Sequence, residues 1–341
     1  MLEFNPNNVG VANGSFFALP YKLSESEVVL LSVPWDVTVS YGRGTSAGPQ
    51  SIIDASTQVD LFDERVENCW KTKIATIDID QEMEELNESC AEIAMKVIEA
   101  LEGGEDEKNL QEQIEEVNNG SEQLNDYVYA QSMNYLDMGK IVGVVGGEHS
   151  VPLGLIKAVA DTYDKIGILH IDAHADLREA YEGFTYSHAS IMYNVLQEIP
   201  QVVSIAQVGI RDYCNDESEL IKEEDKLHLF SDIDINKAMY NGDNWNSICD
   251  RIISTLPENI YVSFDIDGLT PDNCPSTGTP VPGGLTYSQA DYLLYKLASS
   301  EKKIVGFDLC EVAPSGSDEW DANVGARILY KLSVFSAFSH K

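Results

Sequence analysis

The sequence places two aspartates and a histidine at alternate positions directly after an apolar run. Asp172, His174 and Asp176 follow residues 166–169, which read Ile-Gly-Ile-Leu. In an extended chain, side chains at every second position point the same way, so two carboxylates and an imidazole would converge on one spot. These groups could bind a metal ion, although a single cluster of this kind is more simply explained as turn formation at a strand end.

The same pattern occurs in two other segments. Glu148 and His149 follow the apolar run 141–145, and Asp265 and Asp267 follow residues 260–264. Residues that only form turns have no reason to recur at equivalent strand ends. The repetition therefore indicates that three separate segments contribute to one metal-binding site.

Apolar runs and helical patterns alternate along most of the chain. We predict strands at 28–33, 73–79, 141–145, 166–171, 202–208, 227–230, 259–264 and 303–309, and helices at 49–57, 151–161, 188–197, 216–225, 244–256, 286–299 and 319–337. This alternation predicts an α/β fold, a three-layer αβα architecture with a mainly parallel central sheet. In such sheets ligands bind beyond the carboxyl ends of the strands, so the three clusters should meet at one edge.

The chain has 341 residues, of which 43% are hydrophobic, and can bury a large core. It shows no fixed-period repeat and no linker, so we expect a single domain spanning residues 1–341. Residues 82–137 are rich in Glu, Gln, Asn and Leu with helical spacing, broken at Gly103-Gly104 and interrupted again at 118–120. They predict an acidic helical insertion on the outside of the sheet, with a solvated charged face.

The balance of charge restricts the possible partners. With 57 acidic and 22 basic residues the net charge is −35. Repulsion of phosphate groups disfavours nucleic acid and anionic membrane, whereas a small cationic substrate would be attracted. Solubility or adaptation to salt explains the same acidic surface without any ligand.

Other features of the sequence indicate a cytoplasmic protein. The sequence does not open on a basic segment followed by an apolar core, and no apolar run approaches the ~20 residues that span a bilayer. The six cysteines lack the paired spacing of a disulfide framework or a zinc ribbon.

The ligand candidates are four carboxylates and two imidazoles: His149, Asp172, His174, Asp176, Asp265 and Asp267. This set has too many carboxylates for one structural zinc, which takes four Cys or His ligands. It suits a pair of harder divalent ions, with manganese the best match and nickel, cobalt or zinc as alternatives. Two such ions can lower the pKa of a shared water from about 15.7 toward neutrality, so the expected chemistry is metal-assisted hydrolysis.

The three segments also resemble the signature segments of a known family. Residues 146–150 (Gly-Gly-Glu-His-Ser), 172–176 (Asp-Ala-His-Ala-Asp) and 263–267 (Ser-Phe-Asp-Ile-Asp) are similar, in order and spacing, to those of the ureohydrolases, the arginase and agmatinase family. The likeness extends over about residues 40–326. It implies an arginase-like fold, two Mn²⁺ per chain and a homo-oligomer, a trimer or hexamer.

The resemblance also implies roles for individual residues. Asp172 and Asp265 would bridge the two ions, with His149 and Asp176 completing one ion and His174 and Asp267 the other. Asp176 is assigned to catalysis as well as to metal binding. Glu148 would support the site without binding an ion, and His170, which lacks a partner pattern, is expected to be structural.

Two further residues are expected to act on the substrate. Glu311, in the segment Asp308-Leu309-Cys310-Glu311, matches the family glutamate that pairs with the guanidinium. A carboxylate is the natural bidentate partner of that planar group, which supports the assignment independently. His188 matches the family's proton-shuttling histidine, and an imidazole that titrates near neutral pH can protonate the leaving amine. Without the resemblance, a structural histidine at a helix start would explain His188 equally well.

The loop 176–188 resembles the agmatinase version and lacks the Asn and Ser donors with which arginases hold the substrate α-carboxylate. The resemblance therefore implies cleavage of agmatine to putrescine and urea, a step of polyamine biosynthesis. The loop 268–284 departs from the family pattern at Ser276 and Val281, and Arg178 could hold a carboxylate, although we expect it to pair with neighbouring acids. Arginase, guanidinobutyrase and formimidoylglutamase are the alternatives within the family. A deacetylase-like zinc hydrolase and a non-catalytic metal-binding protein are the alternatives outside it.

Overall fold

The structure, a computed structural model, describes residues 4–40, 42–316 and 318–341. Over these residues eight strands form one sheet, in the order β2-β1-β3-β8-β7-β4-β5-β6. The strands are β1 Val28–Val33, β2 Ile74–Ile77, β3 Ile141–Gly146, β4 Ile166–Ile171, β5 Val202–Val208, β6 Leu227–Phe230, β7 Asn259–Asp265 and β8 Lys303–Cys310. All neighbouring pairs are parallel, so the predicted parallel sheet is confirmed.

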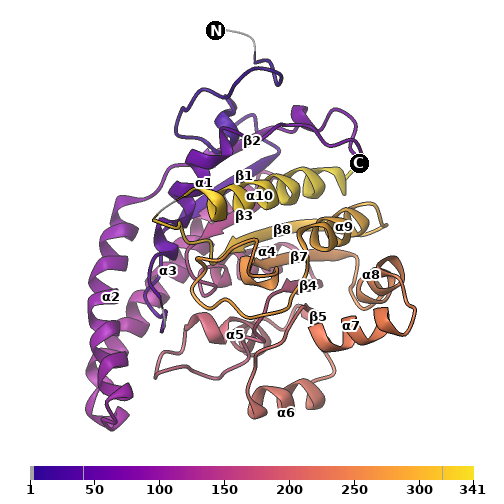
Figure 1. Cartoon of the computed structure of the whole chain (residues 1–341). Coiled ribbons are helices and arrows are strands. Elements are labelled where there is room, and N and C mark those ends of the chain that lie inside the picture. The colour runs from indigo at the N-terminus through magenta and orange to yellow at the C-terminus, as the bar shows by residue number, and fades with distance from the viewer. Residues whose placement is uncertain (1–3, 41, 317) are drawn as a thin grey trace.

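Helices connect the strands and cover both faces of the sheet (Figure 1). They are α1 Gly48–Ser56, α2 Gln81–Glu102, α3 Gln111–Leu136, α4 Leu153–Thr162, α5 Ile191–Glu198, α6 Asn215–Glu223, α7 Asp232–Tyr240, α8 Trp245–Ser254, α9 Tyr287–Ala298 and α10 Trp320–Phe338. The helix α7 was not predicted from the sequence. It begins after Ser231, whose hydroxyl accepts a hydrogen bond from the backbone N–H of Asp234 and so caps the first turn.

Two hydrophobic cores separate the three layers. Buried residues of α1, α8, α9 and α10 pack on one face of the sheet, and those of α2, α3, α4 and α5 pack on the other. The strands contribute to both cores because their side chains alternate: in β4, Leu169 and Ile171 face the first core, while Ile166 and Ile168 face the second. The predicted three-layer αβα architecture is therefore confirmed.

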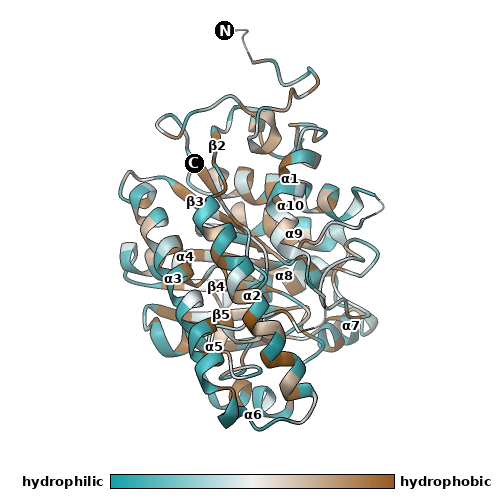
Figure 2. Ribbon diagram, turned by 90° about the vertical axis from the view of Figure 1, so that its left-hand side faces the viewer, coloured by the Kyte–Doolittle hydropathy of each residue, from teal (hydrophilic) through white to brown (hydrophobic). Residues whose placement is uncertain are grey.

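The predicted acidic insertion forms the long helices α2 and α3, which lie side by side at one side of the molecule (Figure 1). The outward surface of α2 is largely hydrophilic (Figure 2). The chain leaves the helix at Gly103 as predicted, but the interruption predicted at 118–120 is wrong, because α3 continues through it. A Cβ atom at Gly120 would lie 2.3 Å from Sγ of Cys90 on α2, so glycine permits the close approach of the two helices. That the chain forms a single domain stays a prediction.

None of the helices in the described ranges has the length and apolar character that crossing a bilayer requires. The six cysteines, all of them within these ranges, are free thiols.

Candidate active site

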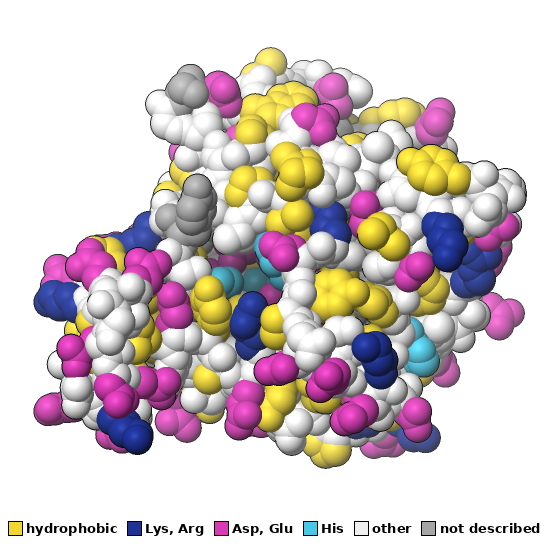
Figure 3. All heavy atoms as spheres, turned by 60° about the horizontal axis from the view of Figure 1, so that its bottom comes forward, with side chains coloured by type: hydrophobic (Ala, Val, Ile, Leu, Met, Phe, Trp, Pro, Cys, Tyr) yellow, Lys and Arg dark blue, Asp and Glu magenta, His cyan; other side chains and the backbone are white. Residues whose placement is uncertain are grey.

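Four adjacent strands in the middle of the sheet, β3, β8, β7 and β4, end at the same edge. The predicted ligands follow three of them: His149 after β3; Asp172, His174 and Asp176 after β4; Asp265 and Asp267 at the end of β7. Glu311 follows the fourth strand, β8. The structure therefore brings together side chains that lie up to 162 positions apart in the chain. Figure 3 shows a hollow in which histidine side chains are visible beside acidic and basic ones.

His149 is the centre of one group of side chains. Its Nδ1 lies 3.0 Å from Oδ2 of Asp172, 3.1 Å from Oδ2 of Asp176 and 3.4 Å from Oδ2 of Asp265. All four side chains are buried. On the other side of the ring, Nε2 of His149 lies 2.9 Å from the hydroxyl of Ser263, which holds the imidazole in place.

His174 is the centre of a second group. Its Nδ1 lies 3.1 Å from Oδ2 of Asp267 and 3.5 Å from Oδ1 of Asp172. Asp172 thus has one carboxylate oxygen facing each histidine, with its Oδ1 also accepting a 2.6 Å hydrogen bond from the backbone N–H of His174. The two groups meet at Asp172.

The electrostatics of these groups fit bound cations. Burial, together with the charge on Asp172, raises the pKa of Asp176 to about 6, and burial and the charges of Asp267 and Asp172 raise the pKa of Asp265 well above its usual range. Burial lowers the pKa of His174, but the carboxylates of Asp267 and Asp172 outweigh it and raise that pKa to about 12. Buried carboxylates repel one another unless positive charge compensates them, and divalent ions would supply that charge.

The donor geometry also fits a metal site. Oδ2 of Asp267 is buried and has no hydrogen bond of acceptable geometry, although Nδ1 of His174 lies 3.1 Å from it. Distance alone does not make a hydrogen bond, so this oxygen is free to act as a ligand. Nitrogen and oxygen atoms of His149, His170, Asp172 and Asp176 lie within 4.8 Å of one another, as do those of Asp172, His174 and Asp267. Each group could hold one ion.

Glu311 lies beside the first group. Its Oε1 accepts a 2.8 Å hydrogen bond from the backbone N–H of His149, and its side chain is 6% exposed. Burial, followed by the charge of Glu148, raises its pKa well above the usual range. Glu311 and Asp176 have φ angles of 64° and 54°, the left-handed conformation that non-glycine residues rarely adopt. Such strain concentrates at functional sites, where it costs about 1–3 kcal/mol for each residue.

His188 is held by the loop that follows β1. Oγ1 of Thr38 lies 3.3 Å from Nδ1 of His188, accepts a 3.1 Å hydrogen bond from its backbone N–H, and donates a 2.8 Å hydrogen bond to Oε1 of Glu148. A hydroxyl has only one proton to donate, so Nδ1 of His188 is the donor in its contact with Thr38 and Nε2 is left unprotonated in the neutral ring. Burial, together with the charge of His174, lowers the pKa of His188 to about 4.

Glu148 accepts hydrogen bonds from the backbone N–H and hydroxyl of Thr38 and from the hydroxyl of Ser150, at 2.6–2.8 Å. Burial raises its pKa to about 7. Both of its oxygens are thus occupied by protein donors, which agrees with a supporting role.

A pocket of about 200 Å³ opens onto His174, Asp176 and His188. Its other lining residues are Ser40, Arg178, Tyr181, Ala189, Asp212, Tyr213, Glu217 and Thr279. The expected pairing of Arg178 with neighbouring acids does not occur among the described residues; its guanidinium lies 4.9 Å from the ring centroid of Tyr181 instead. The pocket therefore combines acidic groups with a guanidinium that is stacked on an aromatic ring.

Arg211, which follows β5, attaches the loop 268–284 to this edge of the sheet. The guanidinium of Arg211 donates hydrogen bonds to the backbone carbonyls of Asp267, Leu269 and Val281, at 2.7–3.3 Å. Farther along the loop, the hydroxyl of Thr277 donates a 2.8 Å hydrogen bond to the carbonyl of Glu311. This loop, which itself follows β7, thus contacts the segments that follow β5 and β8.

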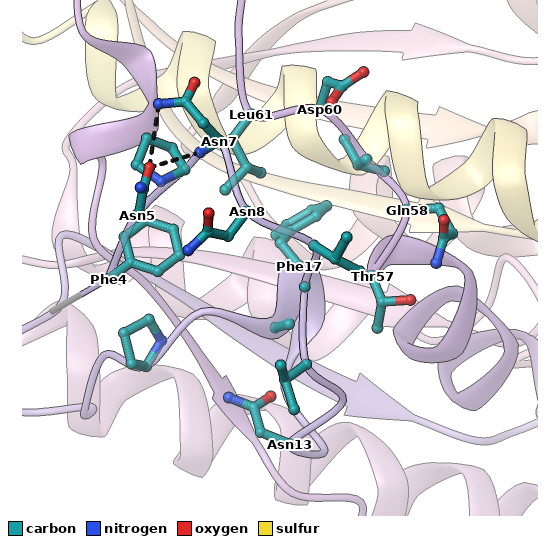
Figure 4. Close-up of a pocket in the computed structure, with 17 residues that line it drawn as sticks. Phe4, Asn5, Asn7, Asn8, Asn13, Phe17, Thr57, Gln58, Asp60 and Leu61 are labelled. Carbon is teal, nitrogen blue, oxygen red and sulfur yellow. Dashed lines mark hydrogen bonds between the residues drawn. The ribbon is translucent and has the colours of Figure 1, made fainter. Parts of the chain in front are cut away.

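A separate cavity of about 540 Å³ lies under the N-terminal segment 4–20, beside residues 57–61 (Figure 4). Of the described residues that line it, Asp60 alone has an ionisable side chain. This cavity therefore offers no group of side chains that could carry out the predicted chemistry.

Several residues that contact the predicted ones or their neighbours were not predicted from the sequence. They are Thr38, Gln207, Ser263 and Asp308, and His170 was expected only to be structural. Each is a polar residue in or beside a largely apolar strand, and this interruption was the available signal.

Comparison with known proteins agrees with this geometry. The sequence matches the Arginase family over residues 26–334. It is 31% identical to the N(1)-aminopropylagmatine ureohydrolase of Thermus thermophilus over 87% of this chain and 85% of that protein, and 31% identical to the agmatinase of Bacillus anthracis over 85% and 84%. The fold is similar to that of the agmatine ureohydrolase of Thermoplasma volcanium, with a TM-score of 0.73, 22% identity and coverage of 97% and 96%. The chain therefore belongs to the arginase family and is a ureohydrolase, a hydrolase that acts on linear amidines.

Proposed function

We propose that the protein is an agmatinase, which cleaves agmatine to putrescine and urea with the help of two Mn²⁺ ions. In this proposal Asp172 and Asp265 would be ligands shared by the two ions. His149 and Asp176 would hold one ion, and His174 and Asp267 would hold the other. The contacts of the two histidines support this division, because His149 lies near Asp176 and His174 near Asp267.

The observation that carries the proposal is the position of Glu311. Its carboxylate is fixed against the backbone of His149, so it lies beside the ligand cluster in a buried environment. A carboxylate there can bind a guanidinium through paired hydrogen bonds and orient its carbon toward the ions. A site built only to hold metal would have no need of this additional buried acid.

The chain's own groups supply the other steps. When bound, the pair of ions would provide a water of lowered pKa and polarise it for attack. His188, neutral and with Nε2 unprotonated, can take up a proton and pass it to the departing amine. The hydrogen bond of Nδ1 with Thr38 keeps the ring in the orientation that this transfer needs.

N(1)-aminopropylagmatine is the second candidate substrate, because the relative from Thermus thermophilus that carries this name is as similar to the chain as the agmatinase. Both compounds combine a guanidinium with a cationic tail. Asp212, exposed at the pocket, could attract either tail.

Urea release from a panel of guanidino compounds tests the proposal. Purified protein loaded with Mn²⁺ should release urea from agmatine faster than from N(1)-aminopropylagmatine, arginine or 4-guanidinobutyrate, and metal analysis of the same sample should find two ions per chain. Faster hydrolysis of aminopropylagmatine would transfer the assignment to the second candidate. Faster hydrolysis of arginine would overturn the preference for a substrate without a carboxylate.

We also propose that the chain forms a homo-oligomer, a trimer or hexamer. Family resemblance is the support for this assembly. Light scattering coupled to gel filtration would measure its mass, and a monomer at micromolar concentration would contradict the proposal.

A further inference from the structure

A row of polar side chains crosses the sheet below the predicted ligands. The row consists of Gln207 on β5, His170 on β4, Ser263 on β7 and Asp308 on β8. In the parallel register His170 pairs with both Gln207 and Ser263, and Ser263 pairs with Asp308. All four side chains are completely buried.

The polar row lies between a row that contains predicted ligands and a largely apolar row. Two positions later along the strands, on the same face of the sheet, lie the predicted ligands Asp172 and Asp265. Two positions earlier lie Ile205, Ile168 and Tyr261. Burying a polar group costs free energy unless it forms hydrogen bonds. A polar row directly below the ligands therefore calls for an explanation in terms of the contacts that it makes.

His170 makes contact with a ligand on one side of its ring. Its Nε2 lies 2.8 Å from Oδ2 of Asp172, the same oxygen that lies 3.0 Å from Nδ1 of His149. On the other side of the ring, Nδ1 of His170 lies 3.1 Å from Nε2 of Gln207. Gln207, His170 and Asp172 thus form a continuous chain of contacts.

A backbone carbonyl determines which atoms donate in this series of hydrogen bonds. Nε2 of Gln207 also donates a 2.7 Å hydrogen bond to the carbonyl oxygen of Ala175. A carbonyl oxygen can only accept, so the amide nitrogen of Gln207 must face it, and the second N–H of that nitrogen points to His170. Nδ1 of His170 is therefore the acceptor, and Nε2 carries the proton that is donated to Asp172.

This orientation of Gln207 has a cost, and it fixes Asp172. The side-chain oxygen Oε1 of Gln207 is buried without a hydrogen-bond partner, a cost that the two hydrogen bonds of Nε2 must offset. Asp172 is held at both oxygens, by His170 at Oδ2 and by the backbone N–H of His174 at Oδ1. Contacts within the protein therefore fix the plane of this carboxylate.

We propose that His170 and Gln207 are positioning residues that orient Asp172, the carboxylate placed between the two groups of ligands. The inference rests on the proposed metal site and adds to it two residues that do not themselves bind an ion. Groups that hydrogen-bond to a metal ligand typically contribute 10–100-fold to metal affinity. His170→Leu and Gln207→Met remove the donors while approximately keeping the volume, and His170→Gln keeps an N–H that can reach Asp172.

Equilibrium dialysis of metal-free protein against Mn²⁺ measures both the number of ions and their affinity. We expect His170→Leu and Gln207→Met to bind two ions per chain at saturation, with Kd values about 10–100-fold higher than those of the wild type. His170→Gln should recover most of the affinity. The melting temperatures of the metal-free variants should stay close to that of the wild type, while the increase that Mn²⁺ causes becomes smaller. His340, whose Nε2 lies 3.0 Å from the carbonyl oxygen of Ile304, provides the control as His340→Leu.

Other outcomes would overturn the inference in different ways. Loss of one ion from His170→Leu at saturating Mn²⁺ would make His170 a ligand. Unchanged Kd values in His170→Leu and Gln207→Met would show that His170 and Gln207 have no role in metal binding. If the melting temperatures of these variants fell while Kd stayed the same, the role of the two residues would be structural. If His170→Leu does not fold, Gln207→Met and His170→Gln still decide the question. A wild-type chain that binds no ions would overturn the proposed function itself, and this inference with it.

Discussion

The backbone N–H of His149 donates a 2.8 Å hydrogen bond to Oε1 of Glu311. This bond joins the segment that follows β3 to the one that follows β8, and it leaves Oε2 of Glu311 facing Gly278, where a Cβ atom would lie 3.6 Å away. The residue proposed to bind the guanidinium is therefore held by the residue proposed to bind an ion.

Replacing Glu311 with glutamine should weaken substrate binding without releasing the ions. Glutamine keeps an oxygen for the His149 amide but loses the negative charge that pairs with a guanidinium. Hydrogen bonds to charged groups contribute about 1.5–3 kcal/mol, so kcat/KM for agmatine should fall by about 10–150-fold. Steady-state kinetics and metal analysis of the same preparation would check this, with the exposed Glu301→Gln as the control. A variant with wild-type kcat/KM would show that another group binds the guanidinium.

Asp265→Asn should reduce metal content from two ions to one per chain and reduce urea release to background. The substitution keeps the size of a buried side chain but removes the charge that a bridging ligand supplies. Metal analysis after dialysis would measure the loss. Asp250→Asn, at an exposed position, should keep both ions. Two ions retained by Asp265→Asn would contradict its proposed bridging role.

His188→Ala should reduce kcat while leaving both ions in place. General acid–base groups contribute about 10²–10⁴-fold to turnover, and the hydrogen bonds of His188 are with Thr38 and Ser187 and not with a predicted ligand. Turnover and metal content measured together would separate the two effects, with His228→Ala as the control. Loss of an ion from His188→Ala would show that its proposed role is wrong.

Mn²⁺ binding should release protons and become tighter as the pH rises. In the metal-free site the pKa of His174 is about 12, so its imidazole is protonated at neutral pH and must lose that proton before it can bind an ion. Asp176, with a pKa of about 6, adds a competing proton below that pH. Both effects weaken binding as the pH falls. Calorimetry in two buffers of different ionisation enthalpy would count the released protons, and proton uptake would contradict the expected sign.

Arg178→Met should leave the preference for agmatine over arginine in place. The Arg178 guanidinium is stacked on Tyr181 and would repel the ammonium group of agmatine, so its removal should raise kcat/KM by at most about fivefold, since partly exposed charge pairs contribute up to ~1 kcal/mol. Kinetics with agmatine, arginine and 4-guanidinobutyrate would measure this. A selective loss of activity toward the two carboxylate-bearing compounds would show that Arg178 binds a carboxylate.

The sequence predicted the strands well because most of them are short apolar runs. The candidate ligands were proposed because alternate Asp and His residues stand out after three of these runs. The helix α7 was missed because Asp232-Ile233-Asp234-Ile235 alternates with the period of a strand, which hides the helical pattern. The interruption predicted in α3 was wrong because packing of Gly120 against Cys90 outweighs the low helix propensity of Asn and Gly.

The residues around the predicted ligands were harder to find. Gln207, Ser263 and Asp308 are polar residues within largely apolar strands, and nothing in the local sequence relates one to another. Their relationship depends on the strand order β8-β7-β4-β5, which does not follow the order of the chain. Only the register of the sheet places them in one row.

The sheet and the loops contribute different things to this enzyme. The side chains proposed to hold the ions follow three strands, β3, β7 and β4, of one rigid hydrogen-bonded sheet, whereas most of the pocket lining comes from the connections after β1, β4, β5 and β7. Loops tolerate insertions and exchanges that strands do not. Exchange of the segments 178–187 and 270–283 for those of a relative could therefore change which guanidino compound is accepted, while the side chains proposed to hold the ions stay in place.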